Sequence, residues 1–523
     1  MISLCLLVAL MTATAGTELH DAILLITGAS SVEELDEQVM ERFSALHGNP
    51  LPLNTSSRSR LLASGLFTEY QAVALIDYRS HGDILSWAEL GLVDGFSPAL
   101  ASALSLFCTV GDGTLEQLST GRVGGEFLAR SAVKVSEDVN VCYGGKCNFT
   151  IGDILEVNWG SRTTYSEPRF GPGTASIAVY GRRGKIVLGD FNARYGQGLC
   201  QWSGFTLGSY SSVTAMHRKA TGLSASKSFT RTLHGIGADY DIGRWNVGGA
   251  WSWPGTYIVH GGRYGKNISA GATAMYSREG GTGLAADWRA GAGNLCCWGE
   301  AAWNSRVGWG ILTGLQHSPS YGTKEALLLK WQNGALQSVA GFQNKYITST
   351  VDAVWNKSYK GLLIVNPEFT KADFKLSPSA RLQYRYKPGD KDPSRFELRA
   401  EAGLTWRELL MLKARYDWVR CQGNAWLWYA EAGVTRPAVT AYLRFTLFKV
   451  DSWSDRIWVY ERDAPGNFNV PAYYGRGFAA CAVVSYKHRK QCLHLRAGTV
   501  RYPWNLQSKL PKTEIKLQYQ LKL

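Results

Sequence analysis

The stretch RFELRAEAGLTW, residues 395–406, alternates apolar and polar side chains without a break. Its apolar positions are Phe396, Leu398, Ala400, Ala402, Leu404 and Trp406. Successive side chains of a β-strand point to opposite faces, so this period of two predicts a strand with one apolar face. Glu397, Arg399 and Glu401 would share the other face. A ladder of salt bridges is the simpler interpretation of these charges, and a selectivity feature of a pore is the alternative.

The same alternation continues on both sides of this stretch, for example in RLQYRYK (381–387) and EIKLQYQLKL (514–523). A soluble β-sandwich also alternates, so alternation alone does not decide. Three further features do: almost 400 residues lack a helix of ordinary length, glycines lie on the polar faces, and Trp and Tyr gather at segment ends. These features predict a large antiparallel transmembrane β-barrel over 125–523, with roughly 16–24 strands.

Charge divides the chain at residue 110. Residues 17–110 hold 4 Lys and Arg against 12 Asp and Glu, a net charge of −8, and residues 111–523 hold 52 against 30, a net charge of +22. This division indicates two different surroundings. The basic excess could meet nucleic acid or anionic lipid, or could simply be a set of solvated loops and a charged lumen.

The N-terminal part reads as targeting sequence followed by helices. Residues 1–15 have the apolar run and A-x-A pattern of a secretory signal peptide. We expect an acidic amphipathic helix within 16–49, where Ser31 and Glu34 form a capping-box pattern. Short helices with glycine breaks follow in 50–110, and Gly-rich 111–124 is expected to be a linker.

The segment VDGFSPALASAL, 93–104, resembles the helix-hairpin-helix unit of DNA-repair and competence proteins. Gly95 and Phe96 match the first two hairpin positions of that family, and Ser97 replaces its second glycine. In an earlier, less regular copy, Gly65 and Leu66 match and a phenylalanine replaces the second glycine. The predicted fold class is therefore α+β multi-domain, with a small all-α tandem helix-hairpin-helix domain followed by the barrel.

The resemblance implies that backbone N–H groups of the hairpins contact a phosphate or a partner. Residues 50–110, however, hold three basic residues (Arg58, Arg60 and Arg79) against five acidic ones, and affinity for nucleic acid comes mainly from Lys and Arg. The favoured hypothesis is a docking or plug module in envelope assembly or transport. Nucleic acid binding for DNA uptake is the alternative.

A second resemblance concerns the barrel. GDFNARYGQGLCQWSGFTLG, 189–208, resembles a Gly- and aromatic-rich segment of Gram-negative outer-membrane proteins that carry an N-terminal helix-hairpin-helix region. It implies an outer-membrane location with the N-terminal domain in the periplasm. The expected partners are outer-membrane lipid and a periplasmic or envelope protein.

Little in the sequence indicates chemistry. Cys142 and Cys147 bracket YGGK, which reads as a turn, so we expect a disulfide between them. His488 and His494 are too isolated to predict a metal site. We expect no catalytic residues, metal or cofactor, and a protein that is not an enzyme.

Overall fold

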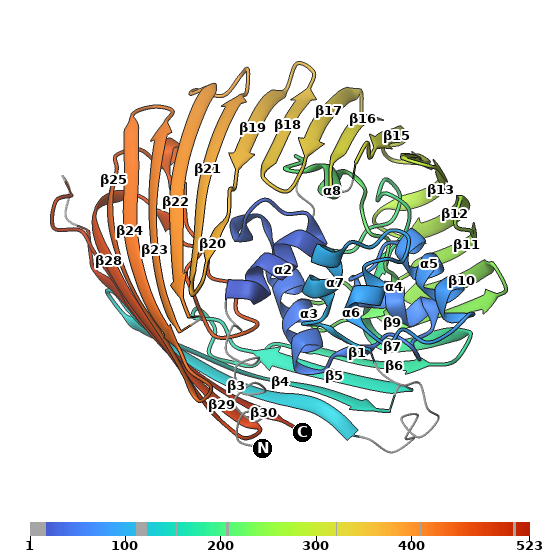
Figure 1. Ribbon diagram of the computed structural model, residues 1–523, viewed down its shortest axis with the longest axis horizontal. Coiled ribbons are helices and arrows are strands. Elements are labelled where there is room, and N and C mark those ends of the chain that lie inside the picture. Colours follow the sequence, from blue (N-terminus) through green and yellow to red (C-terminus); the bar gives the residue numbers. More distant parts are fainter. Residues whose placement is uncertain are drawn as a thin grey trace.

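The computed structural model describes residues 17–110, 123–152, 154–204, 209–320, 322–407, 409–505 and 509–523. Its main element is a closed antiparallel β-barrel of 24 strands (Figure 1). The first strand, β3 (Val123–Val135), pairs along its length with the last, β30 (Lys512–Lys522). The Leu523 N–H completes the seam by donating to the Gly125 carbonyl at 2.9 Å. The predicted transmembrane barrel architecture is confirmed, and its strand number lies at the upper end of the expected range.

Each remaining strand of the ring pairs with its neighbours in sequence. The strands of the first half are β4 (Val139–Ile151), β5 (Leu155–Arg162), β6 (Thr174–Tyr180), β7 (Gly184–Arg194), β9 (Leu233–Ile242), β10 (Trp245–Ser252), β11 (Thr256–Tyr264), β12 (Ile268–Ser277), β13 (Gly281–Ala292), β14 (Leu295–Asn304) and β15 (Gly308–His317). Those of the second half are β16 (Lys324–Gln332), β17 (Ala335–Gln343), β18 (Ile347–Val354), β19 (Ser358–Val365), β21 (Phe374–Tyr386), β22 (Ser394–Trp406), β23 (Leu410–Arg420), β24 (Asn424–Thr435), β25 (Val439–Val450), β28 (Gly475–His488) and β29 (Gln491–Arg501).

Short strands interrupt or branch from this ring. Both β20 (Phe369–Lys371) and β19 pair with β21, so together they act as one broken strand. The C-terminal end of β7, residues 191–194, pairs with β8 (Gly222–Ala225), and residues 184–191 pair with β9. Two small sheets lie outside the ring order, β1 (Leu51–Pro52) with β2 (Cys108–Thr109) and β26 (Ile457–Trp458) with β27 (Ala472–Tyr473).

The barrel wall is apolar outside and polar inside. In β6 the outward positions include Ile177 and Val179, whereas Thr174 and Ser176 point inward and are buried. The outward side chain of Leu327 on β16 is 60% exposed although it is fully apolar. A band of exposed apolar side chains is unfavourable in water and favourable against lipid. Lipid is tolerated at this face because every strand of a closed barrel has its backbone hydrogen bonds made by its two neighbours. The barrel therefore spans a membrane.

The N-terminal residues form a bundle of short helices inside the ring of strands (Figure 1). The helices are α2 (Thr17–Thr27), the 3₁₀ turn η1 (Val32–Glu34), α3 (Glu37–Gly48), α4 (Arg58–Ser64), α5 (Glu69–Arg79), α6 (Trp87–Leu90) and α7 (Pro98–Leu104). We call residues 17–110 the plug. Among the described residues, no helix has both the length and the apolar content needed to cross a bilayer.

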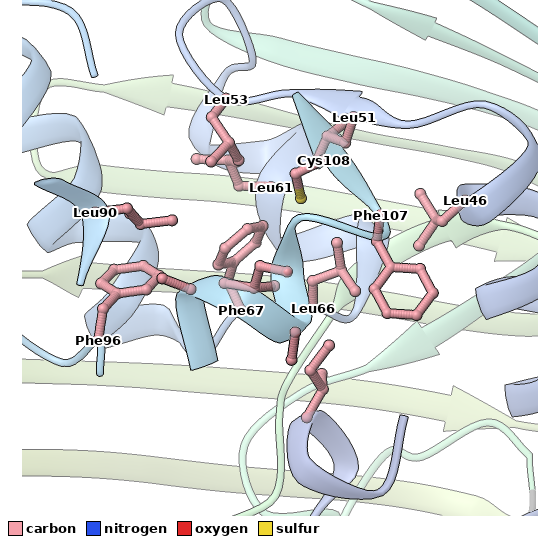
Figure 2. Close-up of a cluster of buried hydrophobic side chains, with 14 of the residues drawn as sticks. Leu46, Leu51, Leu53, Leu61, Leu66, Phe67, Leu90, Phe96, Phe107 and Cys108 are labelled. Carbon is pink, nitrogen blue, oxygen red and sulfur yellow. The ribbon is translucent and has the colours of Figure 1, made fainter. Parts of the chain in front are cut away.

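The plug has its own hydrophobic core, shown in Figure 2. Phe67 and Phe107 are almost completely buried in it, and the Phe43 and Phe107 rings meet edge-on at 5.0 Å. Nearly all of the cluster comes from residues 19–110, and only Phe468 joins it from the barrel sequence. Among the described residues, the apolar core of the plug therefore packs mainly against itself.

Side-chain caps set the helix starts. Thr68 and Gln71 form a reciprocal capping box at α5, and the Ser97 hydroxyl accepts the Leu100 N–H at α7, where Pro98 fills the first turn. The capping box expected at Ser31 does not form. Ser31 instead precedes η1 without a side-chain cap bond, and α3 begins after Asp36.

The position of the plug bears on one expectation. We expected the N-terminal domain in the periplasm, as a docking or plug module, and it lies within the ring and contacts the lumen wall (Figure 1). Its periplasmic location stays a prediction. The single helix expected within 16–49 is two helices joined by η1. The expected signal peptide (1–15) lies outside the described residues, and so does the expected linker except for Val123 and Gly124, which belong to β3.

Candidate functional site: the interface between plug and barrel

A row of plug carboxylates faces basic side chains of the lumen wall. Glu33 and Glu34 lie on η1, and Glu37 and Glu41 follow on α3 at helical spacing, so that they lie close together on one side of the plug. Each of the four forms an ion pair with a wall residue: Arg415, Arg381, Arg162 and Lys146, respectively. The opposite net charges of the two parts of the chain thus meet at this interface.

The pairs made by η1 are deeply buried. Glu33 Oε1 lies 2.7 Å from Arg415 Nη1, and its other oxygen lies 3.5 Å from Arg399 Nη1. Glu34 Oε1 lies 3.1 Å from Arg381 Nη2. Burial opposes ionisation of Glu33, but Arg399 and Arg415 outweigh it and hold the pKa of this carboxyl well below its usual range. Both partners are therefore charged in the docked state.

The pairs made by α3 differ in strength. Glu37 forms a two-pronged contact with Arg162, at 2.6 Å and 3.0 Å. Glu41 is 3.6 Å from Lys146 Nζ and one of its oxygens is buried without a hydrogen bond among the described residues. Burial raises the pKa of Glu41 to about 7, and the Lys146 charge offsets this only in part. Glu41 is the weakest of the four contacts at neutral pH.

The other side of the plug reverses the charges. Arg58 of α4 pairs with Asp241 of β9 and stacks over the Tyr264 ring at 4.3 Å. The neighbouring Ser59 hydroxyl donates to Asp239, which also pairs with Lys185 at 3.1 Å. Polar contacts on two opposite sides fix the rotation of the plug in the lumen.

Two long inward loops complete the filling of the barrel. The loop 195–232, between β7 and β9, carries α8 (Val213–Met216) and lies against β16 and β17 (Figure 1). Its Lys219 Nζ donates to the Ile26 carbonyl at 2.6 Å and to the Leu66 carbonyl at 2.8 Å. Burial lowers the pKa of Lys219 to about 7. This lysine ties α2 and the first hairpin to the barrel.

The second inward loop, 451–474, joins β25 to β28. The Tyr460 N–H donates to Glu33 Oε1 at 3.2 Å, and its hydroxyl lies 3.0 Å from His20 Nε2. The Arg444 guanidinium of β25 donates to the Tyr460 carbonyl at 2.7 Å and also binds Glu431. The loop thereby connects the plug to the charged lumen wall.

The first predicted hairpin, Gly65 and Leu66, is enclosed. Gly65 ends α4 in the left-handed region (φ +73°), and a Cβ there would lie 2.6 Å from an Arg42 guanidinium nitrogen. Leu66 is 1% exposed, and its N–H donates to the Ser64 hydroxyl. These backbone groups already have partners inside the plug and on Lys219, which leaves no free N–H of Leu66 for a phosphate.

The second predicted hairpin, Gly95, Phe96 and Ser97, lies nearer the surface. Gly95 has φ +83°, its backbone is exposed, and its carbonyl accepts from Gln71 Nε2 at 2.8 Å. Phe96 is buried and its N–H donates to the Val93 carbonyl. Ser97 is used as the helix cap described above. DNA binding by these hairpins stays a prediction that no contact favours.

The expected disulfide is wrong. Cys142 and Cys147 lie in one continuous strand, β4, and YGGK continues that strand instead of turning it. Five residues of strand separate their Cα atoms by about 16 Å, far beyond the 7 Å limit for a bond. Both cysteines are free thiols. An odd separation also places the two side chains on opposite faces of the wall.

The salt-bridge ladder predicted at 395–406 is confirmed. Glu397 pairs with Arg395 at 2.5 Å, Arg399 with Asp417 at 3.0 Å, and Glu401 with Lys413 at 2.6 Å. Arg399 also reaches Glu33 of the plug, so the ladder belongs to the interface. Sequence reasoning missed this contact and both inward loops, although the charge division was a signal for an acidic segment within basic walls. Within the described residues, no group of three or more His, Cys, Asp or Glu is arranged to hold a metal ion.

No family model and no curated protein matched this sequence. Solved structures do show likeness to the chain. OccK3 (OpdO) of Pseudomonas aeruginosa matches with 10% identity and a TM-score of 0.33, over 78% of this chain and 98% of that one. OccK2 (OpdF) of the same organism matches with 9% identity and a TM-score of 0.34, over 77% and 98%. Acinetobacter baumannii OccAB2 matches with 8% identity and a TM-score of 0.33, over 77% and 98%.

Proposed function

We propose that the chain is a non-enzymatic outer-membrane channel for transport, closed by a removable plug formed by its N-terminal helix-hairpin-helix domain. One observation carries this proposal: the plug is a self-contained helical core that meets the barrel through polar contacts. A domain fixed permanently in a barrel gains most by burying apolar side chains against the wall. A domain held by ion pairs can leave without exposing its core to water.

The electrostatics support reversible docking. When the plug moves, water hydrates the carboxylates of Glu33, Glu34 and Glu37 and the arginines that they leave. This hydration offsets most of the lost ion-pair energy, so the docked and displaced states differ little in free energy. The wall that remains would be basic on the side of Arg381, Arg399 and Arg415 and acidic at Asp239 and Asp241. The basic side would favour the passage of anionic solutes.

An envelope protein is the proposed agent that moves the plug. The loop before α6 and the turn after it expose Leu85 and Leu92, at 63% and 85%. These are exposed apolar side chains on a plug whose other leucines are mostly buried. A partner at this face could pull on α6 and α7 without entering the lumen.

Conductance in planar lipid bilayers tests the plug function. The double variant Glu33→Gln/Glu34→Gln removes three plug-wall ion pairs, with Arg415, Arg399 and Arg381, and should raise the frequency of open events at least tenfold over the unmodified protein. The control Asp77→Asn/Asp83→Asn makes the same change in charge on the exposed face of the plug and should leave the protein closed. Equal conductance in the two variants, or an unmodified protein that is already open, would contradict a plug held by these pairs.

A further inference from the structure

A cavity of about 60 Å³ lies between the plug and the barrel wall, where α3 and α4 face strands β5–β8. Four cationic residues line it: Arg42 and Arg60 of the plug, Arg194 of β7, and Lys227 of the inward loop. Glu156 is the single carboxylate among the described lining residues. The lining residues therefore carry a net charge of +3.

Glu156 neutralises only part of this positive charge. Lys227 Nζ lies 2.9 Å from its Oε1. The same carboxylate accepts from Asn158 Nδ2 at 2.9 Å and from the Tyr180 hydroxyl at 3.3 Å. Its oxygens are thus already satisfied by a counter-charge and two neutral donors.

Arg42 and Arg194 have no carboxylate within ion-pair distance in the described part of the chain. Arg194 is only 8% exposed, and it uses its Nε to bind the Ser203 carbonyl at 2.7 Å. The Arg42 Nε is buried without a hydrogen-bond partner. Asp36, the N-cap of α3, attracts both Arg42 and Arg194 electrostatically, but its carboxylate already accepts the Val39 N–H and is one charge against two. Burial, followed by the Arg194 charge, lowers the pKa of Arg42 to about 9.

Buried cations that carboxylates compensate only in part are costly, and a bound anion reduces the cost. Guanidinium groups offer paired N–H donors that match the oxygens of an oxyanion. Neutral donors of the lining, such as the Asn192 amide and the Ser224 hydroxyl, suit the remaining oxygens. A cavity of about 60 Å³ suits a small oxyanion better than a bulky one.

We propose that this cavity binds inorganic phosphate, which bridges Arg42 of the plug and Arg194 of the barrel wall. Gln38 lines the cavity, and its Oε1 is a buried acceptor without a hydrogen-bond donor. An anion that carries a proton can donate to this oxygen, which favours phosphate over sulfate. At neutral pH phosphate keeps a proton to donate and sulfate does not. Phosphate bound to both parts stabilises the docked plug by mass action. This inference stands whether or not the plug opens a channel.

Isothermal titration of the full-length protein in detergent, in buffer freed of phosphate and at constant ionic strength, tests the site. Sodium phosphate should bind saturably with about one equivalent per chain. Arg42→Gln and Arg194→Gln should each weaken binding at least tenfold. Arg407→Gln, which removes the same charge from an exposed pair with Asp373, should bind as the parent does. No saturable binding, or unchanged binding by Arg42→Gln, overturns the proposal.

Further titrations define the ligand. Sulfate should bind at least tenfold more weakly than phosphate, and equal affinity would overturn the assignment to phosphate. Glucose 6-phosphate should not compete, since its sugar exceeds the cavity, and strong competition would show that the site is open to phosphate esters instead. Arg42→Lys keeps the positive charge but loses the paired N–H donors of the guanidinium, so we expect an affinity between those of the parent and Arg42→Gln. Heat-modifiable migration on gels verifies that each variant retains a folded barrel.

Discussion

Glu33 of the plug and Arg415 of β23 form an ion pair at 2.7 Å, although 382 residues separate them in the chain. The Arg415 side chain is 3% exposed and also binds Asp417. Glu33 in turn receives a second arginine, Arg399. The pair therefore joins η1 of the plug to the charged ladder of the lumen wall.

Neutralising Glu33 should weaken plug docking. We expect Glu33→Gln to cost about 1.5–3 kcal/mol, the usual value for hydrogen bonds to charged groups. The cost stays below that of an isolated buried pair because Arg415 keeps Asp417. Amide hydrogen exchange of residues 17–110 measures it. Arg407→Gln, at an exposed pair, is the control and should change exchange little. Equal protection of the plug in Glu33→Gln and the parent would contradict the role of the pair.

Glu69, at the start of α5, should make docking depend on pH. Burial, and then Asp287, raises the pKa of Glu69 to about 8. The displaced plug loses this proton near pH 4.5 and the docked plug keeps it, so the charge on Glu69 costs progressively more docking stability as pH rises from about 4.5 through about 8.

The variant Glu69→Gln removes that cost. Its gain in stability over the parent should be small at pH 5, grow between pH 5 and 8, and level off above pH 8. Denaturant titrations of the plug at several pH values measure the difference. Glu279→Gln, on an exposed turn, should show no such trend. A gain that is independent of pH would show that Glu69 ionises normally.

Gly95 should not accept a β-branched side chain. Its φ of +83° disfavours such residues, and a Cβ would lie 2.7 Å from the Tyr70 ring. We expect Gly95→Val to destabilise the plug by about 1–3 kcal/mol while the barrel remains heat-modifiable. Gly82→Val is the matched control, since a Cβ there meets nothing within 4 Å. Thermal unfolding of both variants gives the comparison, and equal losses would mean that the second hairpin is not strained by a side chain.

The outer wall should reject charge. Leu327 lies mid-strand on the outward face of β16, so we expect Leu327→Arg to cost about 2–4 kcal/mol of barrel stability in a bilayer. Val307→Arg, on the turn before β15, should cost less than about 0.5 kcal/mol. Unfolding in lipid vesicles measures both. A tolerated arginine at 327 would place this face in water and end the membrane assignment.

The barrel could be predicted because each strand alternates between residues that face lipid and residues that face the lumen, and this alternation is visible within a short stretch of sequence. In 395–406 the alternation alone separates Leu398 and Leu404, which face outward, from the ladder of Arg399 and Glu401. The position of the plug could not be predicted in the same way. Its contacts join residues hundreds of positions apart, and the charge division shows that two surfaces are complementary without showing that one lies inside the other.

YGGK shows how a local signal can mislead. Two adjacent glycines predict a turn, but Gly144 lies within β4, where a Cβ would be 2.8 Å from the Arg162 Cβ of the next strand. The glycine permits close approach of two strands instead of a change of direction. The inward loops were missed for a related reason. Loop 195–232 is as rich in glycine and aromatic residues as a strand of the wall, but its α8 packs against β16 and β17 and its Lys219 binds carbonyls of Ile26 and Leu66 in the plug.

The seam between β3 and β30 sets an order of assembly. The plug precedes β3 in the chain, and the ring has no closed form until β30 is available to pair with it. The wall residues that pair with the acidic plug helices lie on strands from β4 to β23, all of which precede β30 in the chain. These strands can therefore meet the plug before the ring closes, so docking and barrel assembly can proceed together.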